Sequence, residues 1–407
     1  MKSWPTKNLG DVCNIVGGGT PSKSKHEFYS GNIPWATVRD MKVELITSTE
    51  HSITSIAVKN SSTNVIPEGN VVIATRVGLG KICMIGQDTA INQDLRGVIP
   101  KSAKSLDVSF LFWWLKNIAP IIVAEGTGAT VQGVKLPFVK SLQIPLPPLP
   151  EQKRIVAILD EAFAGIDAAV ANTEKNLANA RELFESYLNG VFTQKGDGWV
   201  EKTLGDICSI KHGFAFKGEF FRPDGRFMLL TPGSFYEYGG YRDQGKKTKY
   251  YIGEIPEDYL LSEGDFLFAM TEQTAGLLGS SLIVPASDKF LHNQRLGLVQ
   301  LNDGVDWYND FFFHQFNTRN FRAAVQSSAS GLKVRHTSPK KLYEIAIFFP
   351  RTVAEQKIIA NKLNEILAES QHLVTIYQQK LTALAELKQS ILQKAFAGEL
   401  TQGDPHV

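Results

Sequence analysis

Two short segments carry residue types that a nuclease uses for metal-assisted hydrolysis. Glu151-Gln152-Lys153 and Glu355-Gln356-Lys357 both match the Glu-x-Lys pattern of nucleases built from an acidic pair and a lysine. In such nucleases the pattern lies on a strand behind an upstream acid, whereas here each segment opens a predicted helix. A glutamate in the first turn of a helix is stabilised by the positive end of the helix dipole. We therefore interpret both segments as helix starts and not as catalytic sites.

Other catalytic signatures are missing from the sequence. There is no Asn/Asp-Pro-Pro-aromatic loop of the kind that amino-methyltransferases use to hold a flipped base. The segment Gly78-Leu79-Gly80-Lys81 lacks the spacing and the Ser/Thr of a phosphate-binding loop. The histidines form no HxxxH pair, and Cys13, Cys83 and Cys208 form no CxxC pair. The sequence thus predicts no catalytic residues, no metal site and no disulfide framework in this chain, which suits a reducing compartment.

Length and composition indicate a globular protein of at least two domains. The chain has 407 residues, of which 43% are hydrophobic and 21% charged, and single cores stop growing at roughly 250–300 residues. A net charge of +2 gives only weak support for nucleic-acid binding. The start of the chain has no apolar signal region, and no apolar run approaches the ~20 residues of a membrane span, so we expect a cytoplasmic protein.

The sequence repeats itself with a period of about 200 residues. Leu9-Gly10-Asp11-Val12-Cys13 returns as Leu204-Gly205-Asp206-Ile207-Cys208, and Asn92-Gln93 returns as Asn293-Gln294. From the two Glu-Gln-Lys segments onward the copies align without gaps at an offset of 204, ending at Phe192 and Phe396. This period is too long for a solenoid, so it indicates two copies of a globular domain followed by a helix.

The globular parts, residues 1–150 and 196–350, are rich in strand and turn signals. Each is expected to hold one helix near its end, at 108–117 and 307–325, in which Trp113-Trp114 and Phe311-Phe312-Phe313 are more consistent with core packing than with base stacking. The segment 144–150 carries four prolines and predicts an extended exit from the first domain. The second exit, 347–354, carries a single proline.

The segments that follow these exits, 151–195 and 351–407, are predicted to be long helices. Their apolar residues follow steps of four and three over about 40 residues, which is typical of a coiled coil. The alternative is an amphipathic helix lying on one domain, but 40 residues at 1.5 Å each give a rod of roughly 60 Å, longer than such a domain is wide. The simplest arrangement is an antiparallel pair with pseudo-twofold symmetry. The predicted seam consists of Ile155, Leu159, Ile166, Leu177, Tyr187, Ile359, Leu363, Ile366, Leu373, Tyr377, Leu384 and Ile391.

At this point the order of parts resembles a known family. A proline-rich strand that runs into Glu-Gln-Lys, repeated at about 200 residues, together with the two Leu-Gly-Asp openings, is similar to the specificity subunits of type I restriction–modification enzymes. The resemblance covers essentially the whole chain. It implies an α+β fold with two homologous mixed α/β target-recognition domains, 1–150 and 196–350, separated by an antiparallel two-helix coiled coil from the conserved regions 151–195 and 351–407.

The resemblance also implies a function. Each domain would read one half of a bipartite site in double-stranded DNA, and the helices would set the spacer and dock two methylation subunits. Motor-nuclease restriction subunits would join the full complex, S-adenosylmethionine would bind in the methylation subunit, and this chain would need no cofactor of its own.

Residues that read DNA are expected to be basic or amide-bearing side chains in loops. Arginine pairs bidentately with guanine, glutamine or asparagine with adenine, and lysine contacts phosphate. For each residue alone, an ordinary solvated surface charge remains an equal alternative. In the first copy the candidates are Lys23, Lys25, Arg76, Lys81, Gln93, Arg96, Thr130, Gln132 and Lys135. In the second copy they are Lys211, His212, Lys217, Lys246, Lys247, Lys249, Gln273, Gln294, Arg295, Lys333, Arg335 and His336. Asn92 and Asn293 have a structural alternative, as caps of a turn.

Two other classes of function stay open at this stage. One is a single-chain nuclease or methyltransferase with an unrecognised active site, which would act on DNA without partners. The other is a coiled-coil scaffold whose repeated domains bind protein or glycan. Such a scaffold would have no DNA affinity and none of the steep salt dependence that phosphate contacts produce.

Overall fold

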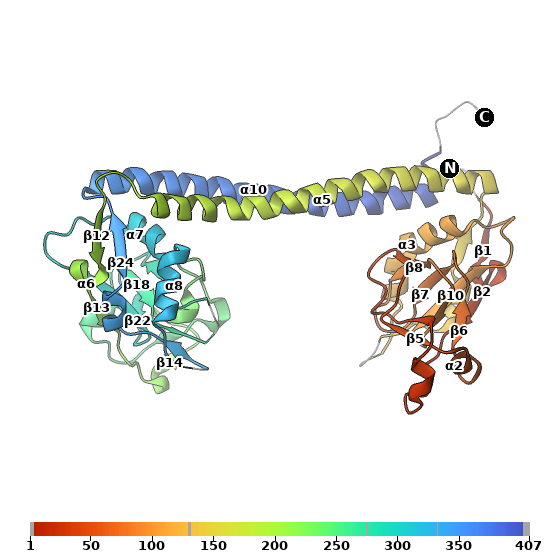
Figure 1. Ribbon diagram of the computed structural model, residues 1–407, viewed down its shortest axis with the longest axis horizontal. Helices are drawn as coiled ribbons and strands as arrows, with labels where there is room; N and C mark the ends of the chain where they lie inside the picture. The colour runs from red at the N-terminus through yellow and green to blue at the C-terminus, as the bar shows by residue number, and fades with distance from the viewer. Residues whose placement is uncertain (1–3, 129–131, 274–275, 332, 402–407) are drawn as a thin grey trace. The chain divides into compact units, whose positions relative to one another are not determined.

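The structure is a computed structural model that describes residues 4–128, 132–273, 276–331 and 333–401 (Figure 1). The chain divides into two compact units. Unit 1 consists of residues 1–174 with 379–407, and unit 2 of residues 175–378. Each unit therefore contains one sheet-rich domain together with one stretch from each of two long helices. Each unit thus holds one copy of the repeated globular domain, whereas each of the two repeated helices is divided between the units.

The domain of unit 1 is built on two sheets that share no strand. The five-stranded sheet has the order β2 (Cys13–Gly17), β10 (Leu95–Pro100), β7 (Val71–Ala74), β8 (Ile82–Ile85) and β4 (Leu45–Ile46). The four-stranded sheet has the order β5 (His51–Ile53), β3 (Ile33–Ala36), β9 (Thr89–Ile91) and β6 (Asn64–Ile66), and β3 and β9 run parallel. The chain enters and leaves through the pair β1 (Thr6–Asn8) and β11 (Gln143–Pro145). The helices are α1 (Leu9–Val12), α2 (Ser55–Lys59), α3 (Val108–Ala124) and α4 (Leu136–Ser141).

The domain of unit 2 repeats this plan. Its entry and exit strands are β12 (Val200–Thr203) and β24 (Ala346–Phe349). One sheet has the order β13 (Cys208–His212), β22 (Leu296–Leu301), β18 (Phe266–Ala269) and β20 (Ser281–Ile283). The other has the order β14 (Phe221–Arg222), β16 (Tyr250–Tyr251), β15 (Phe227–Leu230), β21 (Phe290–His292) and β17 (Leu260–Leu261), again with one parallel pair, β15 and β21. A two-stranded pair joins β19 (Thr271–Glu272) to β23 (Arg335–His336). The short helices are α6 (Leu204–Ile207), α7 (Asn309–Phe316), α8 (Arg319–Ser327) and α9 (Pro339–Tyr343).

The helix expected near the end of each domain differs from its predicted bounds. In unit 1, α3 begins where the Asp107 carboxylate accepts the backbone N–H groups of Ser109 and Phe110 at 2.9 and 3.1 Å, and it continues past Asn117 to Ala124 with Pro120 inside it. In unit 2, the single helix expected at 307–325 is two helices, because Thr318 caps a new start at α8. Trp113, Trp114, Phe311 and Phe312 are buried in the two cores, which confirms their predicted packing role.

The long helices are α5 (Leu149–Gln194) and α10 (Val353–Phe396). Helix α5 begins two residues before the predicted start, because a proline is tolerated in the first turn, where its missing N–H would have no partner. Helix α10 begins two residues later than the predicted region 351–407 and ends at Phe396.

In unit 1 the two helices run antiparallel. The Thr401 hydroxyl donates to the Glu151 carboxylate, and the Lys388 ammonium lies 2.5 Å from Asp167 Oδ1, so the residue numbers fall along α10 as they rise along α5. The predicted seam residues of α5 in this unit are buried at 7% exposure or less, and those of α10 are partly buried against the same core. These residues are Ile155, Leu159 and Ile166 on α5, with Leu384 and Ile391 on α10.

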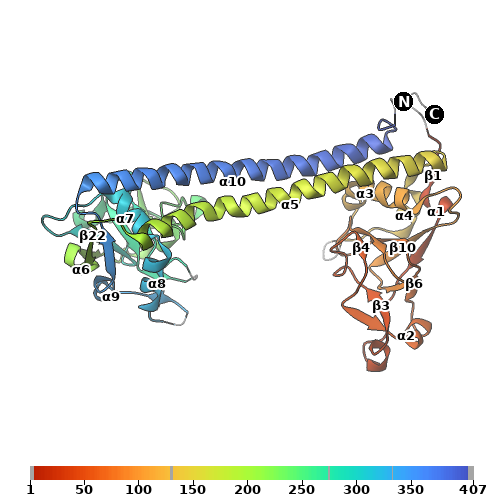
Figure 2. The same cartoon turned by 45° about the horizontal axis from the view of Figure 1, so that its top comes forward.

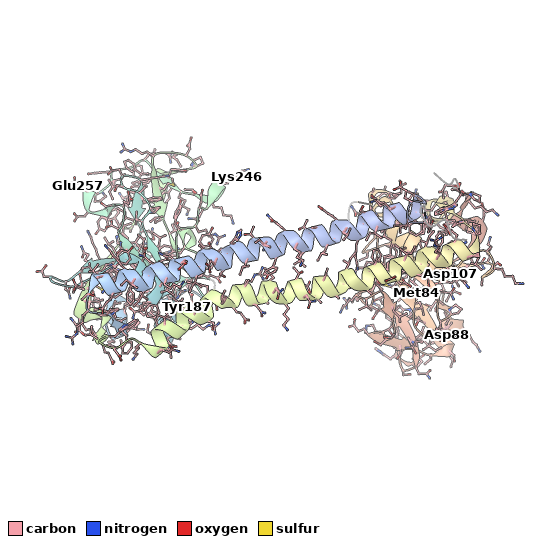
Figure 3. The ribbon with its side chains drawn as sticks, turned by 90° about the horizontal axis from the view of Figure 1, so that it is seen from above. Met84, Asp88, Asp107, Tyr187, Lys246 and Glu257 are labelled. Carbon is pink, nitrogen blue, oxygen red and sulfur yellow. The ribbon has the colours of Figure 1, made fainter. Side chains whose placement is uncertain are left out.

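The helices are also antiparallel in unit 2, where the Ser370 hydroxyl donates to the carbonyl oxygen of Ala180 at 2.5 Å. Of the predicted seam residues there, Leu363 is buried and Leu177, Ile359, Ile366, Leu373 and Tyr377 are partly buried. The prediction for Tyr187 (labelled in Figure 3) is wrong, because this side chain is 39% exposed and the next residue, Leu188, is buried instead. The end of α5 also packs on its domain, with the Phe192 ring 5.2 Å from that of Phe311, so its stripe follows steps of four through Phe184, Leu188 and Phe192.

The glutamine of each Glu-Gln-Lys segment fastens a helix to its own domain. Gln152 is fully buried, its Oε1 accepts the backbone N–H of Asp107 at 2.9 Å, and its Nε2 donates to the carbonyl oxygens of Ser105 and Pro147, both at 2.9 Å. In unit 2, Gln356 is likewise fully buried and bonds Tyr308, Asp306 and Pro350 at 2.8, 3.1 and 3.1 Å.

These contacts give the Glu-Gln-Lys pattern a structural role. They hold the N-terminal ends of α3 and α7 against the long helices, and α3 lies between the sheets and α5 in unit 1 (Figure 2).

Candidate nucleic-acid interface

A cleft of about 670 Å³ opens in unit 1 beside the parallel strands β3 and β9. It joins two predicted DNA-reading residues, Lys23 and Gln93, to polar side chains that the sequence did not single out, among them His26, Arg39 and His51. Its lining consists of Thr20, Lys23, His26, Tyr29, Trp35, Thr37, Val38, Arg39, His51, Val77, Asn92, Gln93 and Asp94.

The glycine segment after β2 positions one wall of this cleft. The carbonyl oxygen of Gly19 accepts the indole N–H of Trp35 at 3.2 Å and the hydroxyl of Thr63 at 2.6 Å. A side chain at Gly18 would collide with the carbonyl oxygen of Asn92. In unit 2, Gly213 approaches the carbonyl oxygen of Asn293 in the same way. These glycines are thus required by close backbone contact.

Asn92 and Asn293 each cap a turn, which is the structural alternative considered for them in the sequence. Asn92 Oδ1 accepts the backbone N–H of Asp94 at 3.1 Å, and Asn293 Oδ1 accepts that of Arg295 at 3.0 Å. The resulting turn presents Gln93 and Asp94 to the first cleft and Arg295 to the second.

The predicted arginines of unit 1 lie around this turn and hold it. Arg96 donates through Nη1 to the carbonyl oxygens of Gln93 and Leu95 at 3.1 and 2.9 Å. Burial lowers the pKa of Arg96, and the nearby charge of Arg76 lowers it further. Arg76 itself is exposed, with its Nε 3.9 Å from Asp94 Oδ1. Of the two, only Arg76 has its side chain largely in solvent, where it is available to a ligand.

Unit 2 has a cleft of about 470 Å³ in the equivalent place, beside β15 and β21. It brings together four predicted residues, Lys247, Lys249, Gln273 and Arg295, which come from segments almost 50 residues apart in the chain. Sequence reasoning missed Arg242 and Gln244 in this wall. The lining consists of Thr231, Pro232, Gly233, Phe235, Glu237, Arg242, Gln244, Lys247, Lys249, Thr271, Glu272, Gln273, Leu277 and Arg295.

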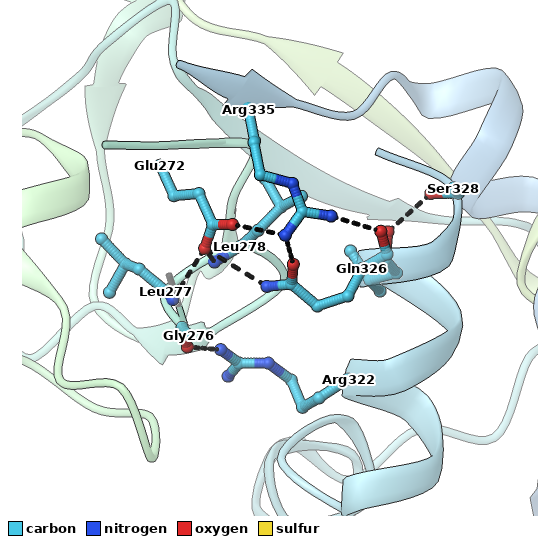
Figure 4. Close-up of polar contacts among 9 residues, drawn as sticks. Glu272, Gly276, Leu277, Leu278, Arg322, Gln326, Ser328 and Arg335 are labelled. Carbon is cyan, nitrogen blue, oxygen red and sulfur yellow. Dashed lines mark hydrogen bonds and ion pairs between the residues drawn. The ribbon is translucent and has the colours of Figure 1, made fainter. Parts of the chain in front are cut away.

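A buried carboxylate organises the floor of the second cleft (Figure 4). Glu272 is 2% exposed, and its Oε2 accepts the backbone N–H groups of Leu277 and Leu278 at 2.9 and 2.8 Å. Its Oε1 lies 3.2 Å from Arg335 Nη1, and the Arg335 guanidinium also donates to the side chain and the carbonyl oxygen of Gln326 at 2.5 and 2.7 Å. Arg335 was predicted to contact DNA, but its terminal nitrogens are engaged inside the unit, so we assign it to holding this floor.

The other predicted residues lie outside the two clefts. Lys211 donates to the carbonyl oxygen of Asp258 at 2.9 Å and is mostly covered, and Lys81 contacts the carbonyl oxygen of Val38 at 3.4 Å. Thr130 lies outside the described residues. The remaining candidates are exposed and stay predictions: Lys25, Gln132, Lys135, His212, Lys217, Lys246, Gln294, Lys333 and His336.

The described residues contain no group of three or more His, Cys, Asp or Glu side chains placed to hold a metal ion. The three cysteines are buried and free, and burial raises the pKa of Cys13 and Cys208 to about 12 and that of Cys83 to about 11. Over the same residues, no helix combines the length and hydropathy of a membrane span.

Comparisons with known proteins agree with this duplicated architecture. The family model of the type I restriction modification DNA specificity domain matches residues 1–177 and again 196–382. The type I restriction enzyme MjaIX specificity subunit of Methanocaldococcus jannaschii is 28% identical over 52% of this chain and 53% of its own length. The EcoR124I/EcoR124II specificity subunit of Escherichia coli is 32% identical over 46% of this chain and 48% of its own length. The chain thus spans about half the length of these two relatives.

Two solved structures share the fold over almost their whole length. One, from a study of complex assembly and conformational transition in a type I R-M system, has a TM-score of 0.77 and 19% identity, covering 98% of this chain and 99% of the other. The HsdS subunit from Thermoanaerobacter tengcongensis has a TM-score of 0.62 and 19% identity, covering 98% and 97%. With the family model matched twice over most of the sequence, the chain belongs to the type I restriction–modification DNA specificity family.

Proposed function

We propose that this chain reads a bipartite sequence in double-stranded DNA, one half with each unit, and performs no catalysis itself. The observation that carries the proposal is the pair of clefts, which lie beside the same parallel strand pair in the two units and differ in their polar lining. Two different half-sites would require this combination, in which the strand arrangement is shared and the polar side chains that line the clefts differ.

The second cleft has the chemistry of a duplex-DNA reader. Four basic residues and two amides line it, with Glu237 and Glu272 as its acids. The charge of Glu272 is paired within the unit by Arg335, so the surface open to a ligand is positive. Arginine and glutamine recognise guanine and adenine edges, and lysine neutralises phosphate. In the first cleft, Lys23, Arg39 and Gln93 supply the same three kinds of contact.

We further propose that α5 and α10 set the spacer between the half-sites and dock two methylation subunits, with motor-nuclease restriction subunits joining them in the cytoplasm. In support, each long helix contributes one stretch to unit 1 and one to unit 2, and in each unit part of the predicted seam packs into the hydrophobic core, at Ile155 and Leu159 in unit 1 and at Leu363 in unit 2. S-adenosylmethionine would then be held by the methylation subunits, and this chain would need no cofactor of its own.

The test is to map methylated positions in the DNA of a host that carries the complex, with and without this chain. We expect the methylated motif to disappear without the chain, and exchange of residues 1–150 for those of another specificity subunit to change one half of the motif only. A change in both halves would refute the modular reading. Cleavage or methylation by the purified chain alone would favour an enzyme, and absence of any salt-dependent DNA affinity would favour a protein- or glycan-binding scaffold.

A further inference from the structure

Two exposed tyrosines stand at the rim of the second cleft. Tyr236 is 39% and Tyr238 70% exposed, and their rings are stacked with centroids 5.0 Å apart and planes within 8° of parallel. Between them in the chain is Glu237, which lines the cleft, as does the preceding Phe235. Two adjacent exposed rings beside a polar cleft offer an aromatic face on which a flat ligand group can stack.

The loop that carries these rings is fixed to the rest of unit 2. The Ser280 hydroxyl donates to the carbonyl oxygen of Tyr236 at 2.7 Å, and Arg322 Nη1 donates to that of Glu237 at 3.0 Å. The backbone N–H of Gly240 donates to the carbonyl oxygen of Ser281 at 2.8 Å. Gly239 and Gly240 turn the chain back with φ of +96° and +90°, a conformation that favours glycine. The backbone of this loop is thus fixed before any ligand binds, and the two rings pack on each other, which lowers the entropic cost of binding.

The neighbouring charges indicate which ligand the rings fit. Arg242 follows the loop closely in sequence and shares the cleft with Lys247, Lys249 and Arg295. A ligand that offers both anionic groups to this basic wall and a flat face to the rim is a nucleic acid. An apolar protein surface would satisfy the tyrosines and leave the basic wall without a partner.

We propose that the exposed face of Tyr238 stacks on a base of the second half-site, next to the bases contacted by the cleft. The inference rests on the proposed function and adds a stacking contact from a loop that has no aromatic counterpart in unit 1. The segment that follows β3 in unit 1, residues 37–44, contains no aromatic residue, although it leads away from the equivalent strand. Stacking on a duplex base requires that one base step open, so the contact also predicts a local distortion of the DNA.

The test uses the full chain in complex with its methylation subunits and duplexes that carry the mapped site, with 2-aminopurine at each position of the second half in turn. We expect Tyr238→Ala to weaken binding roughly 5- to 150-fold, the range found for loss of one base–aromatic stack. Tyr238→Phe, which keeps the ring, should bind within about threefold of wild type. The salt dependence of the affinity should not change, because no phosphate contact is removed.

The fluorescent base should report the contact directly. We expect one position in the second half to change its emission with the wild-type protein and with Tyr238→Phe, but not with Tyr238→Ala. Leu301→Ala, an exposed apolar residue at the far end of β22 from Arg295, is the matched control and should bind as wild type. Thermal melts of all variants separate loss of a contact from loss of fold.

The outcomes distinguish this inference from the function on which it rests. If Tyr238→Ala bound DNA as tightly as the wild type and no 2-aminopurine position responded, the stacking contact alone would be overturned. Weaker assembly with the methylation subunits at unchanged DNA affinity would likewise overturn it and assign the tyrosines to a protein interface. Wild-type protein that does not discriminate the mapped site from other DNA would overturn both.

Discussion

Replacing Gln152 with alanine tests how the domain of unit 1 is held on its helix. The substitution removes one acceptor and two donor contacts from a fully buried position: those to the backbone N–H of Asp107 and to the carbonyl oxygens of Ser105 and Pro147. Alanine leaves these three backbone groups with no replacement partner from residue 152.

The magnitude follows from those three bonds. A hydrogen bond contributes about 1 kcal/mol net, and a buried group left unpaired costs about 1–3 kcal/mol. We therefore expect Gln152→Ala to lower the free energy of unfolding of unit 1 by about 3 kcal/mol. For a body of 150–250 residues each kcal/mol lowers Tm by about 2–4 °C, so Tm should fall by roughly 6–12 °C.

Hydrogen exchange localises the effect better than a melt alone. The amide of Asp107 (labelled in Figure 3) donates to Gln152, so its protection should drop in the variant, while the amide of Tyr308, which donates to Gln356 in unit 2, should stay protected. Lys153→Ala, an exposed neighbour in the same helical turn, is the control and should leave both amides and Tm unchanged. If Gln152→Ala left the protection of the Asp107 amide unchanged and Tm within about 1 °C of wild type, Gln152 would not hold the domain of unit 1 on its helix.

Three further predictions concern unit 2 and the helix pair. Burial lowers the pKa of His292 to about 4, so the unfolded chain takes up the proton before the folded chain as pH falls below about 6.5. By pH 5, unit 2 should therefore lose about 2 kcal/mol of stability. Chemical denaturation should find this loss in the wild type and not in His292→Ile. Glu272→Ala removes the ion-pair partner of Arg335 and leaves two backbone N–H groups without their acceptor, so we expect a cost of about 3–5 kcal/mol in denaturant melts. Methylation should be lost at the second half-site more than at the first, and equal loss at both would argue against a role of Glu272 in shaping the second cleft. Asp167→Ala should change stability by less than about 1 kcal/mol, because the Asp167 side chain of the pair with Lys388 is 60% exposed to solvent, and a larger drop in Tm would show that this pair does more than its exposure suggests.

The architecture was predictable from the sequence because its signals are long. A repeat of about 200 residues and 40 residues of four-three spacing sum many weak preferences, and both survive in the structure. Single boundaries carry less information. The prolines of 144–150 predict an extended exit as far as Pro150, whereas α5 already begins at Leu149. The steps of four and three placed Tyr187 in the seam, because the sequence does not reveal that this end of α5 also packs against Phe311 of its domain.

The site was only partly predictable, for a different physical reason. The turn at Asn92 and Asn293 was identified because it recurs in both copies, and it does border both clefts. Arg242 was missed because its only signal, a basic residue in a loop, is shared with many surface residues. Arg335 was misread because its partner, Glu272, is 63 residues away in the chain, and no local pattern discloses a buried ion pair across that distance.

Because the domain is duplicated, the two copies can be compared within one molecule to distinguish residues that support the fold from residues that differ near the clefts. Where both copies keep a residue type in the buried frame, as at Gln152 and Gln356, the two side chains make the same set of backbone contacts. Where the copies differ in the buried strand that leads to each cleft, as at the residue before each structural asparagine, Ile91 in one and His292 in the other, the difference changes polarity without changing strand pairing. On the proposed function, a fold that tolerates such exchange next to its clefts would let one half of the recognition site change while the other half and the long helices stay as they are.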